Sequence, residues 1–247
     1  MGLLGSIVIL VGSLLFLAVR FPAFRKPYIF HGYFAKSPAI NMSKGDNPSK
    51  SLTKEMQPPI RPTRIVVAMT GATGAILGIR LLERLREMNV ETHLIISRWA
   101  IEAIKYETKY SVSDIRALAT RCYPVNNAAA AVSSGSFQTD GMIIVPCSMR
   151  TLSAVRTGFA DDLICRAADV TLKEKRKLVL VVRETPLSCI HLENMLALAN
   201  YGAVIFPPMP AFYTMPGSVD DIVTQNVGRM LDMFGLDAGN FDRWNGF

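Results

Sequence analysis

The stretch of residues 64–75, RIVVAMTGATGA, restricts the possible folds of this chain more than any other part of the sequence. It joins a run of apolar residues to a turn that contains Gly71 and Gly74, and a helical pattern follows. An unbroken apolar run rich in β-branched residues is typical of a parallel strand covered on both faces. A strand, a glycine turn and a helix in this order bring backbone N–H groups and the positive end of a helix dipole to one point. The stretch therefore predicts an α/β fold with a site for a phosphate-bearing cofactor at its first turn.

The same alternation of apolar runs and helical patterns continues along the chain. Predicted strands cover residues 65–69, 92–97, 141–145, 178–182 and 203–206. Predicted helices cover residues 75–88, 98–106, 114–120, 148–157, 163–172 and 188–200, and a last helix begins after Ser218. Strands that alternate with helices of this length predict right-handed βαβ crossovers and a doubly wound parallel sheet. Ligands of such sheets bind beyond the carboxyl ends of the strands.

The N-terminal part of the chain differs from this pattern. Residues 1–19 are uncharged and apolar or small, which is at the lower edge of the length that spans a bilayer as a helix. Basic residues follow this segment, whereas a secretory signal has them before it. We expect a targeting segment or a membrane anchor here. Residues 20–63 contain seven prolines and predict a basic linker without a core of its own, so the folded domain is expected at residues 64–247.

Charge and cysteine content exclude two classes of site. Residues 1–61 contain eight Lys and Arg and two Asp and Glu residues, so they carry +6 of the formal net charge of +7. The predicted domain is nearly neutral, which argues against nucleic acid as a partner. Its four cysteines form no Cys-x-x-Cys pair, and its two adjacent acid pairs lack the spacing of a magnesium site. We therefore expect no metal.

A glycine turn of this kind also occurs in dehydrogenases, which have a third glycine three residues after the second. In this chain Leu77 stands three residues after Gly74, and Gly78 comes one residue later. The second predicted strand ends in Ser97 and Arg98 rather than in the acidic residue that holds a dinucleotide ribose. No tyrosine of the domain has a lysine four residues later, as the Tyr-x-x-x-Lys pattern of those enzymes requires. These differences argue against a nicotinamide dinucleotide.

Three later loops join the TGATG turn to make a more specific combination. They are PCSMRT at residues 146–151, VRETPL at residues 182–187 and PPMPAFY at residues 207–213. With these motifs the chain resembles the UbiX/Pad family of flavin prenyltransferases, formerly described as phenylacrylic acid decarboxylases, and within it the fungal members. The resemblance runs from about Arg64 to the pair Arg243-Trp244 and leaves out the first sixty residues.

The resemblance implies a flavodoxin-like, three-layer fold and a flavin prenyltransferase. Such an enzyme joins a dimethylallyl group from dimethylallyl phosphate to N5 and C6 of reduced FMN without a metal. The prenylated FMN then serves a UbiD-type decarboxylase. The family also implies a homododecamer and, for this chain, a mitochondrial location. The donor is left open between monophosphate and pyrophosphate. Two alternative functions are direct decarboxylation of cinnamic-type acids and a non-catalytic FMN carrier.

The motif matches also imply the residues of the site. The FMN-binding residues would be Gly71, Ala72, Thr73, Ser97, Ser148, Met149, Arg150, Thr151 and Arg183. The prenyl phosphate would be bound by Lys173, Tyr213 and Arg229. The catalytic residues would be Glu107, Lys173, Arg183 and Glu184. This chemistry requires fixed cations at the departing phosphate and a proton acceptor, which could be a carboxylate or the released phosphate itself.

Some of these residues have a simpler interpretation from the sequence alone. Arg229 would be a solvated residue beside an apolar helix stripe, and Lys173 would be one cation of a charged turn. Cys147 has no histidine near it in the sequence, so we expect a small packing residue rather than a nucleophile. Trp244 could cover the flavin or take part in a subunit contact, and the sequence does not decide between them.

Overall fold

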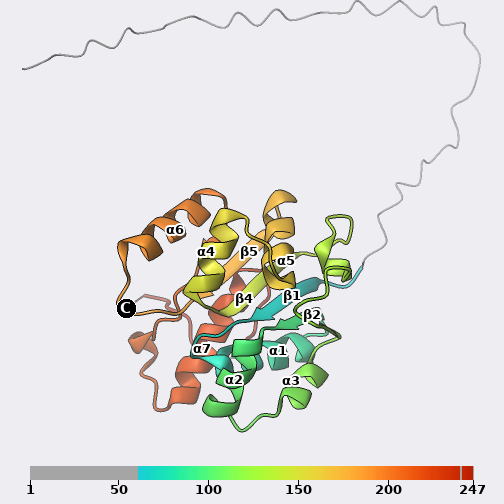
Figure 1. Ribbon diagram of the computed structural model, residues 1–247. Helices are drawn as coiled ribbons and strands as arrows, with labels where there is room; N and C mark the ends of the chain where they lie inside the picture. Colours follow the sequence, from blue (N-terminus) through green and yellow to red (C-terminus); the bar gives the residue numbers. More distant parts are fainter. Residues whose placement is uncertain (1–60, 240, 247) are drawn as a thin grey trace, which may run out of the picture. The chain divides into compact units, whose positions relative to one another are not determined.

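The computed structural model describes residues 61–239 and 241–246 (Figure 1). The predicted segment 1–19 and all but the last three residues of the predicted linker 20–63 lie outside this described part. Within it, no helix has the length and apolar character needed to cross a membrane.

The centre of the described part is a sheet of six parallel strands in the order β3-β2-β1-β4-β5-β6. The strands are β1 Arg64–Met69, β2 Glu91–Ile96, β3 Arg121–Tyr123, β4 Gly141–Cys147, β5 Lys177–Val182 and β6 Val204–Ile205. The strand order reverses between β1 and β4, which pair directly. This is the doubly wound arrangement that the sequence predicts, and the point of reversal is where ligands of such sheets bind.

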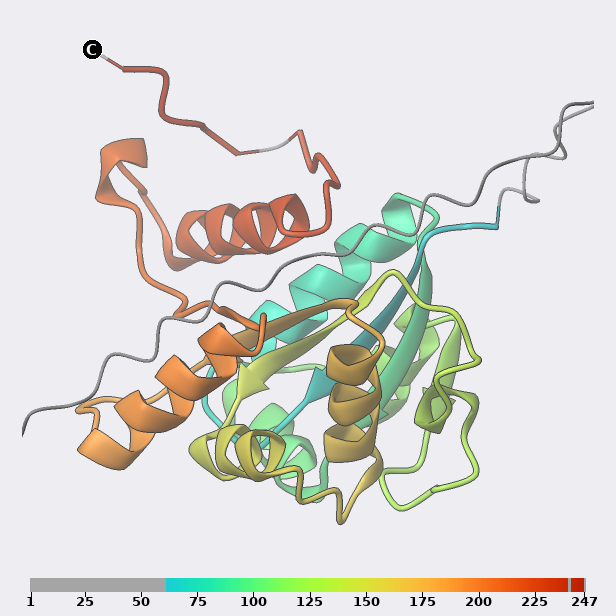
Figure 2. The same cartoon turned by 90° about the horizontal axis from the view of Figure 1, so that it is seen from above.

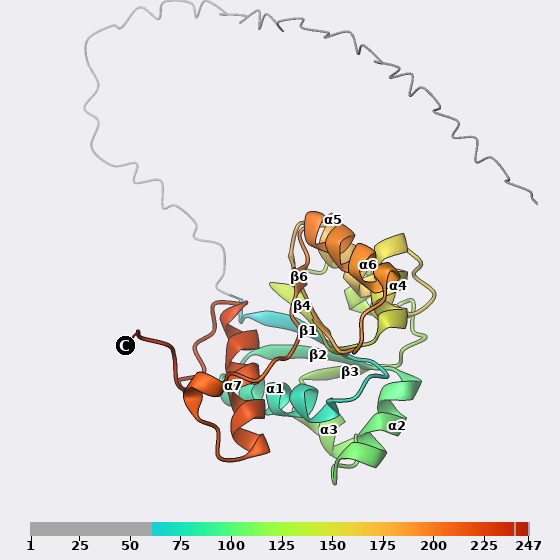
Figure 3. The ribbon, with the colours of Figure 1, turned by 90° about the vertical axis from the view of Figure 1, so that its left-hand side faces the viewer.

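Helices cover both faces of the sheet (Figures 1, 2 and 3). They are α1 Ala75–Glu87, α2 Arg98–Glu107, α3 Val112–Leu118, α4 Met149–Thr157, α5 Leu163–Lys173, α6 Cys189–Asn200 and α7 Val219–Asp232. Alternate residues of β1 enter two different cores, since Ile65 and Val67 pack with the layer of α1 and α7, and Val66 and Ala68 pack with the layer of α4 and α5. Both faces of the strand are therefore buried, which explains its continuous apolar run. The three-layer prediction is confirmed.

Side-chain caps set where most of these helices begin. The hydroxyls of Ser97, Ser148 and Ser218 accept hydrogen bonds from backbone N–H groups in the first turns of α2, α4 and α7. Helix α1 begins differently, after Gly74 in the left-handed conformation with φ 99°. Gly78 lies where a Cβ would come within 2.7 Å of the Val145 carbonyl oxygen, so the displaced third glycine lets α1 pack closely on β4.

The structure corrects the sequence prediction in two regions, around α3 and β3 and at the end of β4. Strand β3, Arg121–Tyr123, is absent from the predicted elements because it is a short edge strand with two exposed residues and no apolar run. Helix α3 begins and ends two residues earlier than predicted, since Ser111 and Asp114 form a capping box at its start. Strand β4 also continues through Pro146 to Cys147.

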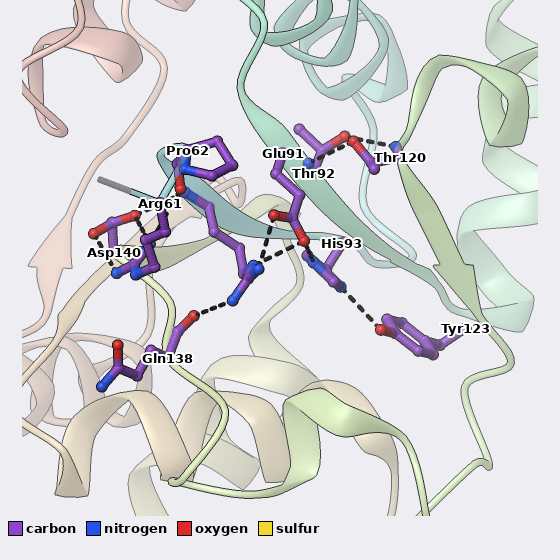
Figure 4. A network of polar contacts seen from close by, with 10 residues as sticks. Arg61, Pro62, Glu91, Thr92, His93, Thr120, Tyr123, Gln138 and Asp140 are labelled. Atoms are coloured by element: carbon purple, nitrogen blue, oxygen red, sulfur yellow. Dashed lines mark hydrogen bonds and ion pairs between the residues drawn. The ribbon is translucent and has the colours of Figure 1, made fainter. Parts of the chain in front are cut away.

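A polar network joins the amino ends of β1, β2 and β3 (Figure 4). Two guanidinium nitrogens of Arg61 lie 2.7 and 2.8 Å from the carboxylate oxygens of Asp140. Arg64 binds Glu91 at 2.8 Å, and Glu91 in turn lies 2.8 Å from Nε2 of the buried His93. Arg61 belongs to the range predicted as linker, and these contacts attach it to the folded domain.

Candidate functional site

The loops after β1 and β4 are joined by one buried side chain, Thr70. Its hydroxyl donates a hydrogen bond to the Pro146 carbonyl oxygen at 2.8 Å and accepts one from the Ser148 backbone N–H at 2.8 Å. The two loops that the sequence assigns to FMN are therefore held side by side at the point where the strand order reverses. Sequence reasoning missed Thr70, although a threonine directly before a glycine turn was a visible signal for such a link.

The glycine turn is closed by two residues of α2, Trp99 in its first turn and Glu107 at its last residue. A Cβ on Gly71 would come within 2.3 Å of the Trp99 Cβ, so only glycine fits there. The Glu107 carboxylate accepts hydrogen bonds from the backbone N–H groups of Gly74 and Ala75 at 2.8 and 2.9 Å. A carboxylate of the chain itself thus binds at the positive end of the α1 helix dipole. The N–H groups of Gly74 and Ala75 are therefore occupied, and within the glycine turn the bend at residues 71–73 remains the predicted place for a ligand.

The predicted hydroxyl contacts lie at the starts of α2 and α4. The Ser97 hydroxyl accepts from the Ala100 N–H at 3.1 Å, and the Ser148 hydroxyl accepts from the Thr151 N–H at 3.3 Å. Each serine caps its helix by accepting, and its own O–H can still donate to a bound group. In the first turn of α4, Met149 is half-buried, while Arg150 is exposed and pairs with Asp161 at 2.9 Å.

Arg183 and Glu184 follow β5 at the same edge. The Arg183 backbone N–H donates to the Cys147 carbonyl oxygen at 3.2 Å, which fixes this loop beside the loop after β4. Both side chains are exposed, and neither has an ion pair among residues 61–239 and 241–246. A hollow of about 210 Å³ brings Arg183 together with Thr73 and Pro208.

A second hollow of about 440 Å³ lies between the loop after Tyr213, helix α7 and the last residues of the chain. Tyr213 stands in the short helical turn η2, Phe212–Thr214, and its hydroxyl accepts from Gln225 on α7 at 3.5 Å. Asn226 is buried and donates to the Met209 carbonyl oxygen at 3.3 Å, which attaches the proline-rich loop to α7. Sequence reasoning missed Gln225 and Asn226, because polar residues in an apolar helix stripe give no sign of their partners.

The remaining predicted phosphate ligands occupy different places. Arg229 lies on α7 and forms an ion pair with Asp232 at 2.7 Å. Lys173 ends α5 and pairs with Glu174, in the turn that precedes β5. Arg183 follows the other end of β5, and a strand of six residues spans about 20 Å. One chain therefore does not bring Lys173 to the carboxyl edge of the sheet with the other site residues.

The two buried cysteines, Cys147 and Cys165, are poor nucleophiles, because burial disfavours the thiolate. Burial raises the pKa of the Cys147 thiol far above its ordinary value, and burial together with Asp162 raises the pKa of Cys165 to about 12. Cys165 also lies near Asp161 and Asp162, but those carboxylates bind Arg150 and the start of α5. Cys147 is the small packing residue that the sequence predicts.

Comparisons with known proteins agree with this architecture. A model of the flavoprotein family matches residues 53–231. A mitochondrial flavin prenyltransferase from Saccharomyces cerevisiae is 56% identical over 222 residues, which are 87% of this chain and 92% of that protein.

Two solved structures extend the comparison. A UbiX protein crystallised with FMN and dimethylallyl pyrophosphate is 64% identical with a TM-score of 0.75, and the match covers 76% of this chain and 100% of that one. A dodecameric FMN-dependent UbiX-like decarboxylase from Escherichia coli O157:H7 is 59% identical with a TM-score of 0.74, over 74% of this chain and 100% of that one.

Proposed function

The chain belongs to the flavoprotein family and, within it, to the UbiX flavin prenyltransferases, and we propose that it joins a dimethylallyl group to N5 and C6 of reduced FMN. One observation carries the proposal. The hollow at the carboxyl ends of β1 and β5 brings the bend at Thr73 and the cation of Arg183 together with α7. A cofactor with a phosphate and a planar ring needs such a set of small residues, N–H donors and one cation.

The residues after β1, β2 and β4 suit FMN. The bend at residues 71–73, the hydroxyls of Ser97 and Ser148 and the N–H groups at the start of α4 can donate to a phosphate and to flavin carbonyls. Thr151 is buried beneath the Ser148 hydroxyl at 3.1 Å and holds its orientation. Reduced FMN, when bound, supplies the nucleophilic ring atoms of the reaction.

Arg183, Arg229 and Tyr213 suit the phosphate of the prenyl donor. As the allylic C–O bond breaks, negative charge grows on that phosphate, and fixed cations lower the free energy of this transition state without a metal. Tyr213 adds a hydroxyl donor and an aromatic face. Lys173 can join them only if a second copy of the chain presents it, which is compatible with a dodecamer like that of the Escherichia coli relative.

Ring closure would add a proton to the prenyl double bond and remove one from C6 of the flavin, so groups at the site would have to supply the first proton and accept the C6 proton. Glu184 is exposed beside Arg183 and can accept it, as can the phosphate that has just been released. Glu107 is already engaged by two backbone N–H groups, so we propose for it a smaller part in proton transfer than for Glu184.

The product and the location of the protein follow from the same family. We propose that prenylated FMN passes to a UbiD-type decarboxylase and that the protein acts in mitochondria, as the name of the yeast relative says of that protein. Addition of the purified protein to an inactive apo-decarboxylase tests the first point, since no gain of decarboxylation would contradict it. Imaging of a tagged full-length chain tests the second.

The transfer itself is tested with purified protein, reduced FMN and dimethylallyl monophosphate or pyrophosphate under anaerobic conditions. We expect the flavin to gain the mass of one C5 unit, and the preferred donor will be the one with the higher kcat/KM. A parallel incubation with cinnamic acid and no partner enzyme should release no carbon dioxide. Carbon dioxide without a modified flavin would instead support the direct decarboxylase.

A further inference from the structure

The C-terminal tail, residues 236–239 and 241–246, connects two predicted substrate residues that lie on different elements. Trp244 meets the ring of Tyr213 edge to face, with 5.6 Å between ring centroids. The preceding residue, Arg243, forms an ion pair with Asp232 in the last turn of α7, and Asp232 also binds Arg229. Figure 3 shows this tail beside α7 and the η2 turn. The Arg243-Trp244 pair is thus connected to both predicted substrate residues, to Tyr213 directly and to Arg229 through Asp232.

Asp232 accepts more hydrogen bonds from Arg243 than from Arg229. Two nitrogens of Arg243 lie 2.9 and 2.8 Å from the two carboxylate oxygens, whereas one nitrogen of Arg229 lies 2.7 Å from one of them. The pKa of Asp232 lies below its ordinary value, and the hydrogen bonds from Arg243 are the largest cause. The Asp232 side chain is 16% exposed, and that of Arg229 is 46% exposed. Arg243 is therefore the main partner of this carboxylate, and Arg229 is held by a single hydrogen bond.

The tail has further contacts that do not depend on Asp232. The Phe241 ring lies where a Cβ on Gly228 would come within 2.2 Å of it, so the ring packs directly on the backbone of α7. The Arg243 guanidinium lies 4.5 Å from the centre of that ring and 3.0 Å from Asp237. The charge of Asp232 can therefore be removed while the tail keeps other anchors.

We propose that Arg243 is a positioning residue: by binding both oxygens of Asp232, it keeps this carboxylate from competing with the phosphate of the prenyl donor for Arg229. The proposal rests on the proposed function, since it takes Arg229 as a ligand of that phosphate. When Arg229 turns to the phosphate, Asp232 keeps both hydrogen bonds from Arg243, so no partly buried carboxylate is left without a cation. Without Arg243, Asp232 would hold Arg229 more tightly and compete with the phosphate.

The test measures binding as well as turnover. Dimethylallyl phosphate is titrated by calorimetry into protein that holds oxidised FMN, and KM and kcat are measured anaerobically with reduced FMN. We expect Arg243→Ala to raise the Kd for dimethylallyl phosphate about five- to tenfold, because these groups are partly exposed, with kcat and FMN affinity unchanged. Arg243→Lys, which keeps the charge but not the two-bond geometry, should raise it about twofold.

Asp232→Asn gives the sharpest comparison. It frees Arg229, so the Kd should stay the same or fall, and the double variant Asp232→Asn/Arg243→Ala should bind like Asp232→Asn alone. If Asp232→Asn weakens binding as much as Arg243→Ala, the pair serves only to attach the tail, and the proposal is overturned. An unchanged Kd in Arg243→Ala overturns it as well.

Two further variants separate this proposal from the proposed function. Arg229→Ala must itself weaken binding of dimethylallyl phosphate. If it does not, the role of Arg229 in the proposed function fails first. Glu87→Gln breaks an exposed pair of the same i,i+3 spacing, in which Arg84 lies 2.6 Å from Glu87 on α1, and it should leave the Kd unchanged. Melting temperatures of all variants show whether each one folds.

Discussion

The charged residues at the two ends of the parallel sheet differ in whether they have ion-pair partners. At the amino ends of β1 and β2, the Glu91 carboxylate binds both Arg64 and His93 (Figure 4). The Arg64 guanidinium also lies 4.5 Å from the centre of the Phe137 ring. At the carboxyl ends, Arg183 and Glu184 are exposed and have no ion pair within the described part of the chain. The first arrangement stabilises the fold, and the second leaves charge available for a ligand.

This contrast indicates which charged residues of this architecture are available to bind a ligand. A charge whose hydrogen bonds are already satisfied gains little from a ligand, since binding would have to break those bonds first. A charge fixed by its backbone but without a partner can bind a ligand at little cost. By this criterion Arg183 is the strongest site residue of one chain. Glu184 accepts one hydrogen bond, from the Thr185 backbone N–H at 3.0 Å, and Arg150, which pairs with Asp161, is a weaker site residue.

The largest effect is expected at the carboxyl end, from Arg183→Ala. The side chain has no structural partner in the described residues, so the melting temperature should change little, while prenyl transfer should fall about 100- to 1,000-fold because one cation at the developing charge is lost. Anaerobic turnover by mass spectrometry and thermal unfolding measure the two quantities. Arg183→Lys is the matched control and should recover part of the rate. A large loss of stability in Arg183→Ala would remove the contrast between the two ends.

The opposite pattern is expected at the amino end, from Glu91→Gln. This change removes the carboxylate that lies 2.8 Å from both Arg64 and His93, so the free energy of unfolding should fall by about 2 kcal/mol. The kcat/KM of the folded protein should stay within about twofold of the original, because these residues lie one strand length from the site, about 20 Å. Denaturant unfolding and steady-state kinetics give both values. A reduced kcat/KM with unchanged stability would contradict the assignment of this network to the fold.

The sequence predicts most of the fold because its signals are local and repeated. The apolar run of β1 is buried on both faces, and Ser97, Ser148 and Ser218 cap the helices that they precede in the sequence. The edge strand β3 gives no such signal, because a strand paired on one side needs no continuous apolar run.

The site is predictable only as far as its residues follow strand ends. Arg183 and Ser148 stand directly after strands, so their position beside the ligand edge follows from topology. Thr70 bridging two loops and Asp232 shared by two arginines depend on tertiary contacts that no sequence spacing specifies. Lys173 shows the limit of motif matching, since one chain places it at the far end of β5.

The smallest expected effect is a pH dependence of the free energy of unfolding that arises in the network at the amino ends of the strands. Burial lowers the pKa of His93 below its ordinary value of about 6.5, so the unfolded chain takes up a proton there before the native protein does. Stability is therefore highest above pH 6.5 and falls as the pH decreases below it. The pKa of Glu91 is lowered by its hydrogen bond from Arg64, and its contribution to stability is lost only at more acidic pH, below its ordinary value of about 4.3.

Between pH 6.5 and 5 the decline in stability should therefore disappear in His93→Gln and persist in His191→Gln, as denaturant unfolding at several pH values would measure. A decline that persists unchanged in His93→Gln would show that the amino-end network is not its source.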